Sequence, residues 1–164
     1  MIRDFQDRDI NDIILLAEQH CEENGTGFGD FNEQELIKFI KQIKIHPDYK
    51  GIVYESEGQV IGYACCQQYY NPWNRHKEGH IQYFYITPSQ RNGFKSKALF
   101  DACEQYFESQ DCDYMVAQTM AFNQEYEVDD VNEEFLDKAD QLFSRLMTNA
   151  GNQYVKGLKQ WTRH

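Results

Sequence analysis

The pattern of apolar and polar residues predicts one short strand and two helices in the first third of the chain. Residues 2–6 alternate apolar and polar side chains, as a half-buried strand does. Apolar residues then recur at helical spacing in two segments, which a glycine-rich loop at residues 21–31 separates. Asn32 and Glu35 form a capping-box-like start to the second helix. The predicted apolar faces consist of Ile10, Ile13, Ile14 and Ala17, and of Leu36, Phe39, Ile40 and Ile43.

Strand-like runs dominate the middle of the chain. Residues 51–55 and 60–64 flank the polar segment 56–59, which predicts a hairpin, and a third run covers residues 81–86. The remaining predicted elements are a helix with Leu99, Ala102, Cys103 and Tyr106 on one face, a strand at 114–122, a helix with Leu136, Ala139, Leu142, Phe143 and Leu146 on one face, and a strand at 154–161. An antiparallel meander followed by a β-α-β crossover predicts an α/β fold, with a mixed sheet and helices on both faces.

Composition and charge narrow the classes of function. The 164 residues include 27 acidic and 16 basic side chains, which gives a formal charge of −11, and 41% of them are hydrophobic. This length and apolar content predict one folded domain over residues 1–164. The negative charge repels phosphate backbones, so we expect no nucleic-acid partner and favour cationic or amine ligands. The longest aliphatic run, residues 13–17, is too short to cross a bilayer, so we expect no membrane partner.

The cysteines and histidines predict neither disulfides nor a metal site. The five cysteines are odd in number and form no Cys-x-x-Cys pair, and the adjacent Cys65 and Cys66 would face opposite ways on a strand. Reduced and mostly buried thiols fit this pattern, so we expect a cytoplasmic protein. His46, His76 and His80 do not lie at a metal-ligand spacing from any cysteine.

The segment at residues 85–99 carries the clearest chemical signal. A predicted strand ends there, a turn with one glycine follows, and an amphipathic helix begins at once. A helix N-terminus presents unpaired N–H groups and the positive end of its dipole, which together favour phosphate binding. Arg91, Lys95 and Lys97 make this stretch basic in an acidic chain. Both a site for an anionic cofactor and an ordinary helix start with solvated lysines remain open from these residues alone.

From Ile2 to about Trp161 the chain resembles the GNAT superfamily of acetyl-CoA-dependent N-acyltransferases in its element order, its meander and this loop. The family pattern Gln/Arg-x-x-Gly-x-Gly/Ala is matched from Gln90 to Gly93, whereas Lys95 occupies the position of the second small residue. The resemblance implies a central, mostly antiparallel sheet of about six to seven strands flanked by about four helices. Residues 124–134 contain six acidic residues and no basic one, so we expect a solvated loop or an acidic insertion in the single domain.

The resemblance also implies residues that bind acetyl-CoA. Tyr85 and Ile86 would pair their backbone with the pantetheine arm as an added strand does, and Asn123 would lie near the cofactor. The backbone amides that would hold the pyrophosphate belong to Arg91, Asn92, Gly93, Phe94, Lys95 and Ser96. The side chain of Lys95 either crowds the phosphates or helps to neutralise them.

Two catalytic positions of the family differ in this chain. Many members carry a glutamate base six residues before the position of Ile86, where this sequence has His80. An imidazole acts as a base near neutral pH, although a loop histidine without a role remains the alternative. The tyrosine that protonates the leaving thiolate in the family corresponds to Phe143, and Tyr126 is a candidate substitute.

These residues predict an acyltransferase that moves an acetyl or short acyl group to a primary amine by direct attack. A catalytically inactive binding or structural protein of the same fold is the alternative, because Lys95 and Phe143 depart from the family pattern. Tyr69, Tyr70 and Trp73 lie where the family lines its acceptor groove, and they would contact a small-molecule or peptide amine. Homodimers are frequent in the family, although no exposed apolar stripe in this sequence favours one.

Overall fold

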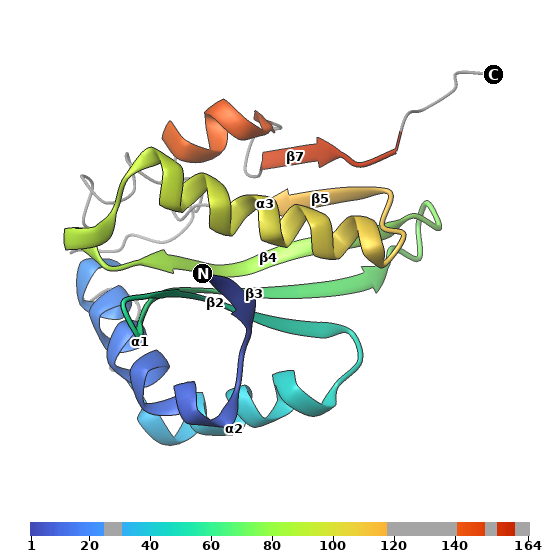
Figure 1. Ribbon diagram of the computed structural model, residues 1–164. Helices are drawn as coiled ribbons and strands as arrows, with labels where there is room; N and C mark the ends of the chain where they lie inside the picture. Colours follow the sequence, from blue (N-terminus) through green and yellow to red (C-terminus); the bar gives the residue numbers. More distant parts are fainter. Residues whose placement is uncertain (25–30, 118–140, 150–153, 160–164) are drawn as a thin grey trace, which may run out of the picture.

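The computed structural model describes residues 1–24, 31–117, 141–149 and 154–159 (Figure 1). A seven-stranded sheet runs through it in the order β1-β2-β3-β4-β5-β7-β6. Its strands are β1 (Ile2–Asp4), β2 (Tyr49–Ser56), β3 (Gln59–Tyr70), β4 (Lys77–Ile86), β5 (Tyr114–Ala117), β6 (Thr148–Asn149) and β7 (Tyr154–Gly157). All described pairings are antiparallel except β4 with β5, which is parallel. The predicted mixed α/β sheet of the GNAT type is confirmed.

In the part of the chain that the structure describes, the sheet is covered by α1 (Ile10–Asn24), α2 (Glu33–Ile45) and α3 (Gly93–Ser109). Helices α1 and α2 lie on one side and α3 lies on the other, where residues 141–146 form a further helical turn (Figure 1). Asn32 begins α2 as predicted, because its side chain accepts a hydrogen bond from the Glu35 amide. Asn92 begins α3 in the same way, through the Lys95 amide.

Each face of the sheet has its own apolar core. The larger core packs the sheet against Leu99, Phe100, Cys103 and Phe107 of α3, all fully buried. The second packs Ile13, Leu16 and Ile40 of α1 and α2 against Val53 and Tyr85. Burying such a side chain contributes roughly 1.5–3 kcal/mol, so both cores stabilise the packing of helices on the sheet.

Several predicted boundaries differ from the structure, and two of them bear on the candidate site. Helix α1 continues to Asn24, so residues 21–24 are helical rather than part of the glycine-rich loop, whose first glycine comes only at position 25. Strand β4 begins at Lys77 rather than at residue 81, and Lys77–His80 pair with Gln67–Tyr70 of β3. The polar sequence of residues 77–80 hid this strand, because Glu78 is a buried carboxylate rather than an apolar side chain.

The C-terminal elements are described in part. The strand predicted at 114–122 is present as β5 up to Ala117, and the following residues lie outside the described ranges, as does the acidic tract 124–134. Residues 141–146 are helical, within the helix predicted to end at Leu146. Strand β7 ends at Gly157, so Leu158 and Lys159 do not continue the predicted strand.

All five cysteines are free thiols, and four of them are buried. Burial raises the pKa of the Cys65 thiol to about 12, so this thiol stays protonated at neutral pH. Within the described residues, no helix is long and apolar enough to cross a membrane.

Candidate functional site

A buried carboxylate at the start of β4 holds the predicted base, His80. Glu78 is 4% exposed, and its Oε2 atom lies 2.9 Å from Nε2 of His80. The other carboxylate oxygen accepts hydrogen bonds from Nδ2 of Asn71, at 2.6 Å, and from the hydroxyl of Tyr114. Asn71 in the loop before β4, Glu78 and His80 in β4, and Tyr114 in β5 therefore form one polar cluster.

The hydrogen bonds to Glu78 keep its carboxylate ionised. Burial alone raises the pKa of Glu78, but hydrogen bonds from Tyr114, His80, Asn71 and Tyr69 outweigh burial and lower the pKa to about 2. An ionised carboxylate only accepts hydrogen bonds, so the proton shared with His80 is on Nε2. The lone pair of the imidazole is then on Nδ1, which makes that nitrogen the basic atom of His80.

Strand pairing fixes which way the His80 ring faces. Gln67 pairs with His80 and Tyr69 pairs with Glu78, so these four side chains share one face of the sheet. The Tyr69 ring lies 4.7 Å from the His80 ring, centroid to centroid. The predicted base and one predicted acceptor contact are thus adjacent, and the imidazole is oriented from two sides.

The strand end that the resemblance assigns to pantetheine presents backbone groups toward β5. The Thr87 amide donates to the Ile61 carbonyl of β3, so Ile86, one residue earlier, directs its backbone groups to the opposite side. The Ile86 carbonyl accepts a hydrogen bond from Nε of Arg91 at 2.7 Å. Parallel pairing of β4 with β5 is described only for Glu78–Ile81.

Arg91 is engaged in a second contact that the sequence did not reveal. Its two terminal nitrogens donate to the Glu23 carboxylate at 2.7 and 2.9 Å, and the Tyr85 hydroxyl donates to the same carboxylate at 2.5 Å. The guanidinium also lies 5.1 Å from the Tyr85 ring centroid. This arrangement ties the end of α1 to the end of β4, immediately before the predicted phosphate loop.

The first turn of α3 is open to solvent. The Asn92 side chain accepts from the Lys95 amide at 2.8 Å, and the Ser96 amide bonds the Asn92 carbonyl, so within the described structure the Gly93 and Phe94 amides are the unpaired donors of this turn. The Phe94 side chain is 90% exposed. The Lys95 ammonium bonds the Gln90 side chain, and Lys97 pairs with Asp101 along the helix.

The other predicted site residues are more scattered. Trp73 is 93% exposed. Tyr70 is also exposed, and the Lys77 ammonium lies 6.0 Å from the centroid of the Tyr70 ring. Phe143 is buried in the larger core and packs against the rings of Phe84, Phe100 and Tyr154. Asn123 and Tyr126 lie outside the described residues.

Sequence reasoning missed Glu78, Asn71 and Tyr114 as partners of His80. One signal was available, since Glu78 precedes His80 by two residues and such residues face the same way on a strand. In the part of the chain that the structure describes, no three His, Cys, Asp or Glu side chains are grouped to hold a metal ion.

Comparisons with known proteins agree with this geometry. The family model described as acetyltransferase (GNAT) family matches residues 14–126, more than half of the chain. No curated protein matched the sequence. Among solved structures, the BH1408 protein of Bacillus halodurans superposes with a TM-score of 0.73 at 16% identity, covering 100% of this chain and 98% of that one.

Two further structures share the fold at low identity. An aminoglycoside antibiotic 6'-N-acetyltransferase of Acinetobacter haemolyticus gives a TM-score of 0.70 at 11% identity, covering 100% of this chain and 98% of that one. A ribosomal-protein-alanine N-acetyltransferase of Brucella melitensis gives a TM-score of 0.65 at 12% identity, covering 100% of this chain and 96% of that one. The family match, together with the sheet order and the strand-turn-helix at residues 85–99, leads to one conclusion: the chain belongs to the acetyltransferase (GNAT) family.

Proposed function

We propose that this protein transfers an acetyl or short acyl group from acyl-coenzyme A to a primary amine, with His80 as the general base. The observation that carries this proposal is the hydrogen bond between Nε2 of His80 and the buried, ionised Glu78. This contact leaves Nδ1 of His80 as a basic nitrogen on a half-buried side chain.

The residues at the end of β4 and the start of α3 fit coenzyme A. The amides of Gly93 and Phe94 are open donors at a helix N-terminus, and nothing lies within 4 Å of the position that a Cβ on Gly93 would take. Ile86 directs its backbone groups away from β3, as pairing with an extended ligand requires. The Ile86 carbonyl already accepts from Nε of Arg91, and its second lone pair remains for a donor on the ligand.

Bound acetyl-coenzyme A would supply an acyl group activated as a thioester. His80 lies six residues before Ile86, about 20 Å along an extended strand, so a long carrier arm is needed to bring the two ends of the site together. The amine nitrogen would form the amide bond as the thioester C–S bond breaks, and the leaving sulfur would take up the proton that this nitrogen loses. Before that step, Nδ1 of His80 would accept a proton from the ammonium group of the acceptor. Glu78 would stabilise the resulting imidazolium through Nε2, and the Tyr69 ring would hold the imidazole in place.

The charge of the chain supports an amine acceptor. A formal charge of −11 attracts cations over distance and repels nucleic acids. The proposed acceptor is a small-molecule or peptide amine, approaching past the exposed rings of Tyr69, Tyr70 and Trp73. The five free thiols fit a reducing compartment such as the cytoplasm.

Two measurements test the proposal. Acetyl-coenzyme A should raise the stability of the fold by about 2.7 kcal/mol at a hundredfold excess over Kd, seen as a thermal shift. A thiol-release assay over a panel of primary amines should then detect turnover, and His80→Ala should lower it about 10²- to 10⁴-fold. Lys41→Ala, which removes an exposed cation on α2, is the control. Binding without thiol release on any amine would instead support the inactive alternative, which the buried, hydroxyl-free Phe143 favours.

A further inference from the structure

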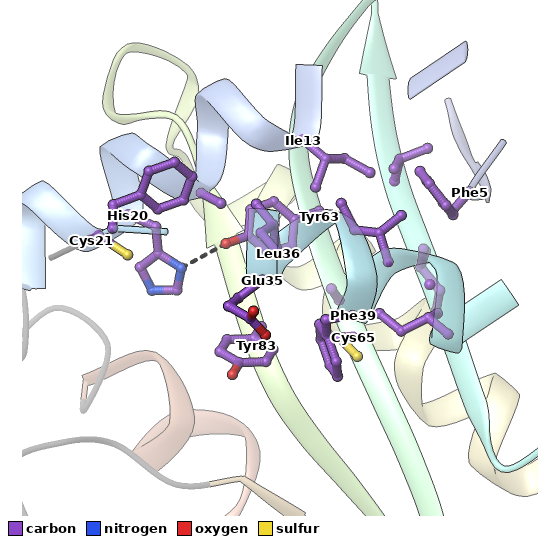
Figure 2. A pocket seen from close by; sticks show the side chains of 18 of the residues that line it. Phe5, Ile13, His20, Cys21, Glu35, Leu36, Phe39, Tyr63, Cys65 and Tyr83 are labelled. Atoms are coloured by element: carbon purple, nitrogen blue, oxygen red, sulfur yellow. Dashed lines mark hydrogen bonds between the residues drawn. The ribbon is translucent and has the colours of Figure 1, made fainter. Parts of the chain in front are cut away.

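A cavity that none of the predicted site residues lines lies between α1, α2 and the sheet (Figure 2). Its volume is about 410 Å³, within the range of small-molecule sites. Its interior is formed by buried side chains of Ile13, Ile40 and Val53, together with Cys65. None of the residues predicted to bind cofactor or acceptor lines it. The cavity is therefore a distinct apolar space within the second core.

The polar groups inside this cavity are uncharged at neutral pH. Nδ1 of His20 lies 2.9 Å from the Tyr63 hydroxyl (Figure 2). Burial lowers the pKa of His20 to about 4. The charge of Glu23 raises this pKa and the charge of Arg91 lowers it, but burial has the largest effect. Burial also raises the pKa of Tyr63 above its usual value. The interior thus suits an apolar group and disfavours an ion.

The mouth of the cavity has the opposite character. Its most exposed lining residues include Glu35, whose side chain is 65% exposed, and Tyr83, which is 47% exposed. Glu35 pairs with Lys38 at 2.5 Å, but exposed pairs of this kind contribute little and are readily exchanged. A carboxylate and an aromatic ring at one entrance together attract an ammonium group.

The mouth and His80 lie on the same face of the sheet. Strand β4 has a bulge opposite Cys65 and Cys66, so Ile81 pairs with Cys66 and Tyr83 pairs with Cys65. Ile81 and Cys66 pack in the core on the α3 side, whereas Cys65 and Tyr83 line the cavity on the other side. His80, adjacent to Ile81, therefore faces the cavity side. Three residues of strand place it about 7–10 Å from Tyr83.

We propose that this cavity binds the apolar body of the amine acceptor, an alkylamine or arylalkylamine whose amino group reaches past Glu35 and Tyr83 toward His80. The assignment of the amine end rests on the proposed acyltransfer, whereas binding of the apolar body does not. Burial of each methylene group should tighten binding about fourfold until the cavity is filled. The acceptor is thereby identified as an amphipathic primary amine rather than a polyamine or a sugar amine.

Calorimetric titration without coenzyme A tests the cavity independently of turnover. We expect Kd to fall about fourfold per methylene from n-propylamine to n-octylamine, and octanoate to bind at least tenfold more weakly than octylamine. Ala17→Met, which adds volume inside the cavity, should weaken octylamine at least tenfold, and Cys65→Met should act alike. Asn11→Met, on the exposed side of α1, is the control and should leave the Kd of octylamine unchanged. A flat chain-length series on the unmutated protein, or equal binding of octanoate, overturns the proposal.

A second arm separates this proposal from the proposed function. With acetyl-coenzyme A present, the same amine series should be acetylated with KM falling as chain length grows, while the acyl chain length of the donor has no parallel effect. Amine binding that follows chain length without any thiol release refutes the acyltransferase and leaves the cavity site standing. Turnover that improves with a longer acyl donor and ignores the amine chain assigns the cavity to the acyl group and refutes the proposal.

Discussion

Replacing Glu78 by glutamine should weaken the fold and disable His80 at the same time. The change keeps the shape of the side chain and removes one charge. The remaining amide oxygen still accepts from Asn71 and Tyr114, whereas the new NH₂ group faces Nε2 of His80. Because that NH₂ group only donates, His80 must move its proton to Nδ1, which then has no lone pair to act as a base.

The size of the stability effect follows from the pKa of Glu78. Despite burial, which raises it, hydrogen bonds lower this pKa from 4.5 to about 2. Each pKa unit corresponds to about 1.36 kcal/mol, so the ionised carboxylate contributes about 3 kcal/mol to the free energy of unfolding at neutral pH. The folded pKa is the lower one, so this contribution is present above pH 4.5 and is lost as the pH falls toward 2. We expect Glu78→Gln to cost about 2–3 kcal/mol at pH 7.

Denaturant unfolding between pH 7 and pH 3 measures this difference. The difference in unfolding free energy between the wild type and Glu78→Gln should be largest above pH 4.5 and should shrink steadily below it. Glu108→Gln, on the exposed side of α3, is the matched control and should leave the curve unchanged. In the thiol-release assay Glu78→Gln should lower kcat about 10²-fold and leave the KM for acetyl-coenzyme A as it is. Equal unfolding free energies at pH 7, with parallel pH curves, would refute the role assigned to Glu78.

Three further changes test other parts of the structure. Wild-type stability should fall as the pH drops from 6.5 toward 4, because buried His20 has its pKa lowered to about 4, and His20→Gln should flatten this part of the unfolding curve. Gly79→Ala should cost roughly 1–3 kcal/mol in denaturant unfolding, since a Cβ there would lie 2.3 Å from the Phe107 ring. Arg91→Lys should lower Tm by the equivalent of about 1–2 kcal/mol, because lysine cannot bond both oxygens of Glu23.

The local pattern of apolar residues was sufficient to predict most of the fold. The hairpin of β2 and β3 and the helices α2 and α3 lie close to where the sequence places them. The helices each have one apolar face, which imposes a period of about 3.6. Strand β3 is buried on both faces and is recognised instead as an apolar run bounded by polar residues. The predicted start of β4 was wrong because Glu78, near the true start of the strand, is buried although its side chain is polar.

The sequence also predicted residues for the two ends of the candidate site. His80 and the loop at residues 91–96 follow from the match to a family pattern, because such patterns concern residues that are close in the chain. Their partners could not be found this way. Arg91 meets Glu23 across 68 residues, and Glu78 meets Tyr114 across 36.

The sequence by itself determined the family, the order of the elements and the acidic character that favours an amine. Only the tertiary structure decided that Glu78 is ionised while buried, which nitrogen of His80 carries the proton, and that a cavity lies between α1, α2 and the sheet. The physical reason is common to all three. The charge state of a side chain and the space around it depend on which distant residues pack against it, and no local period along the chain encodes those contacts.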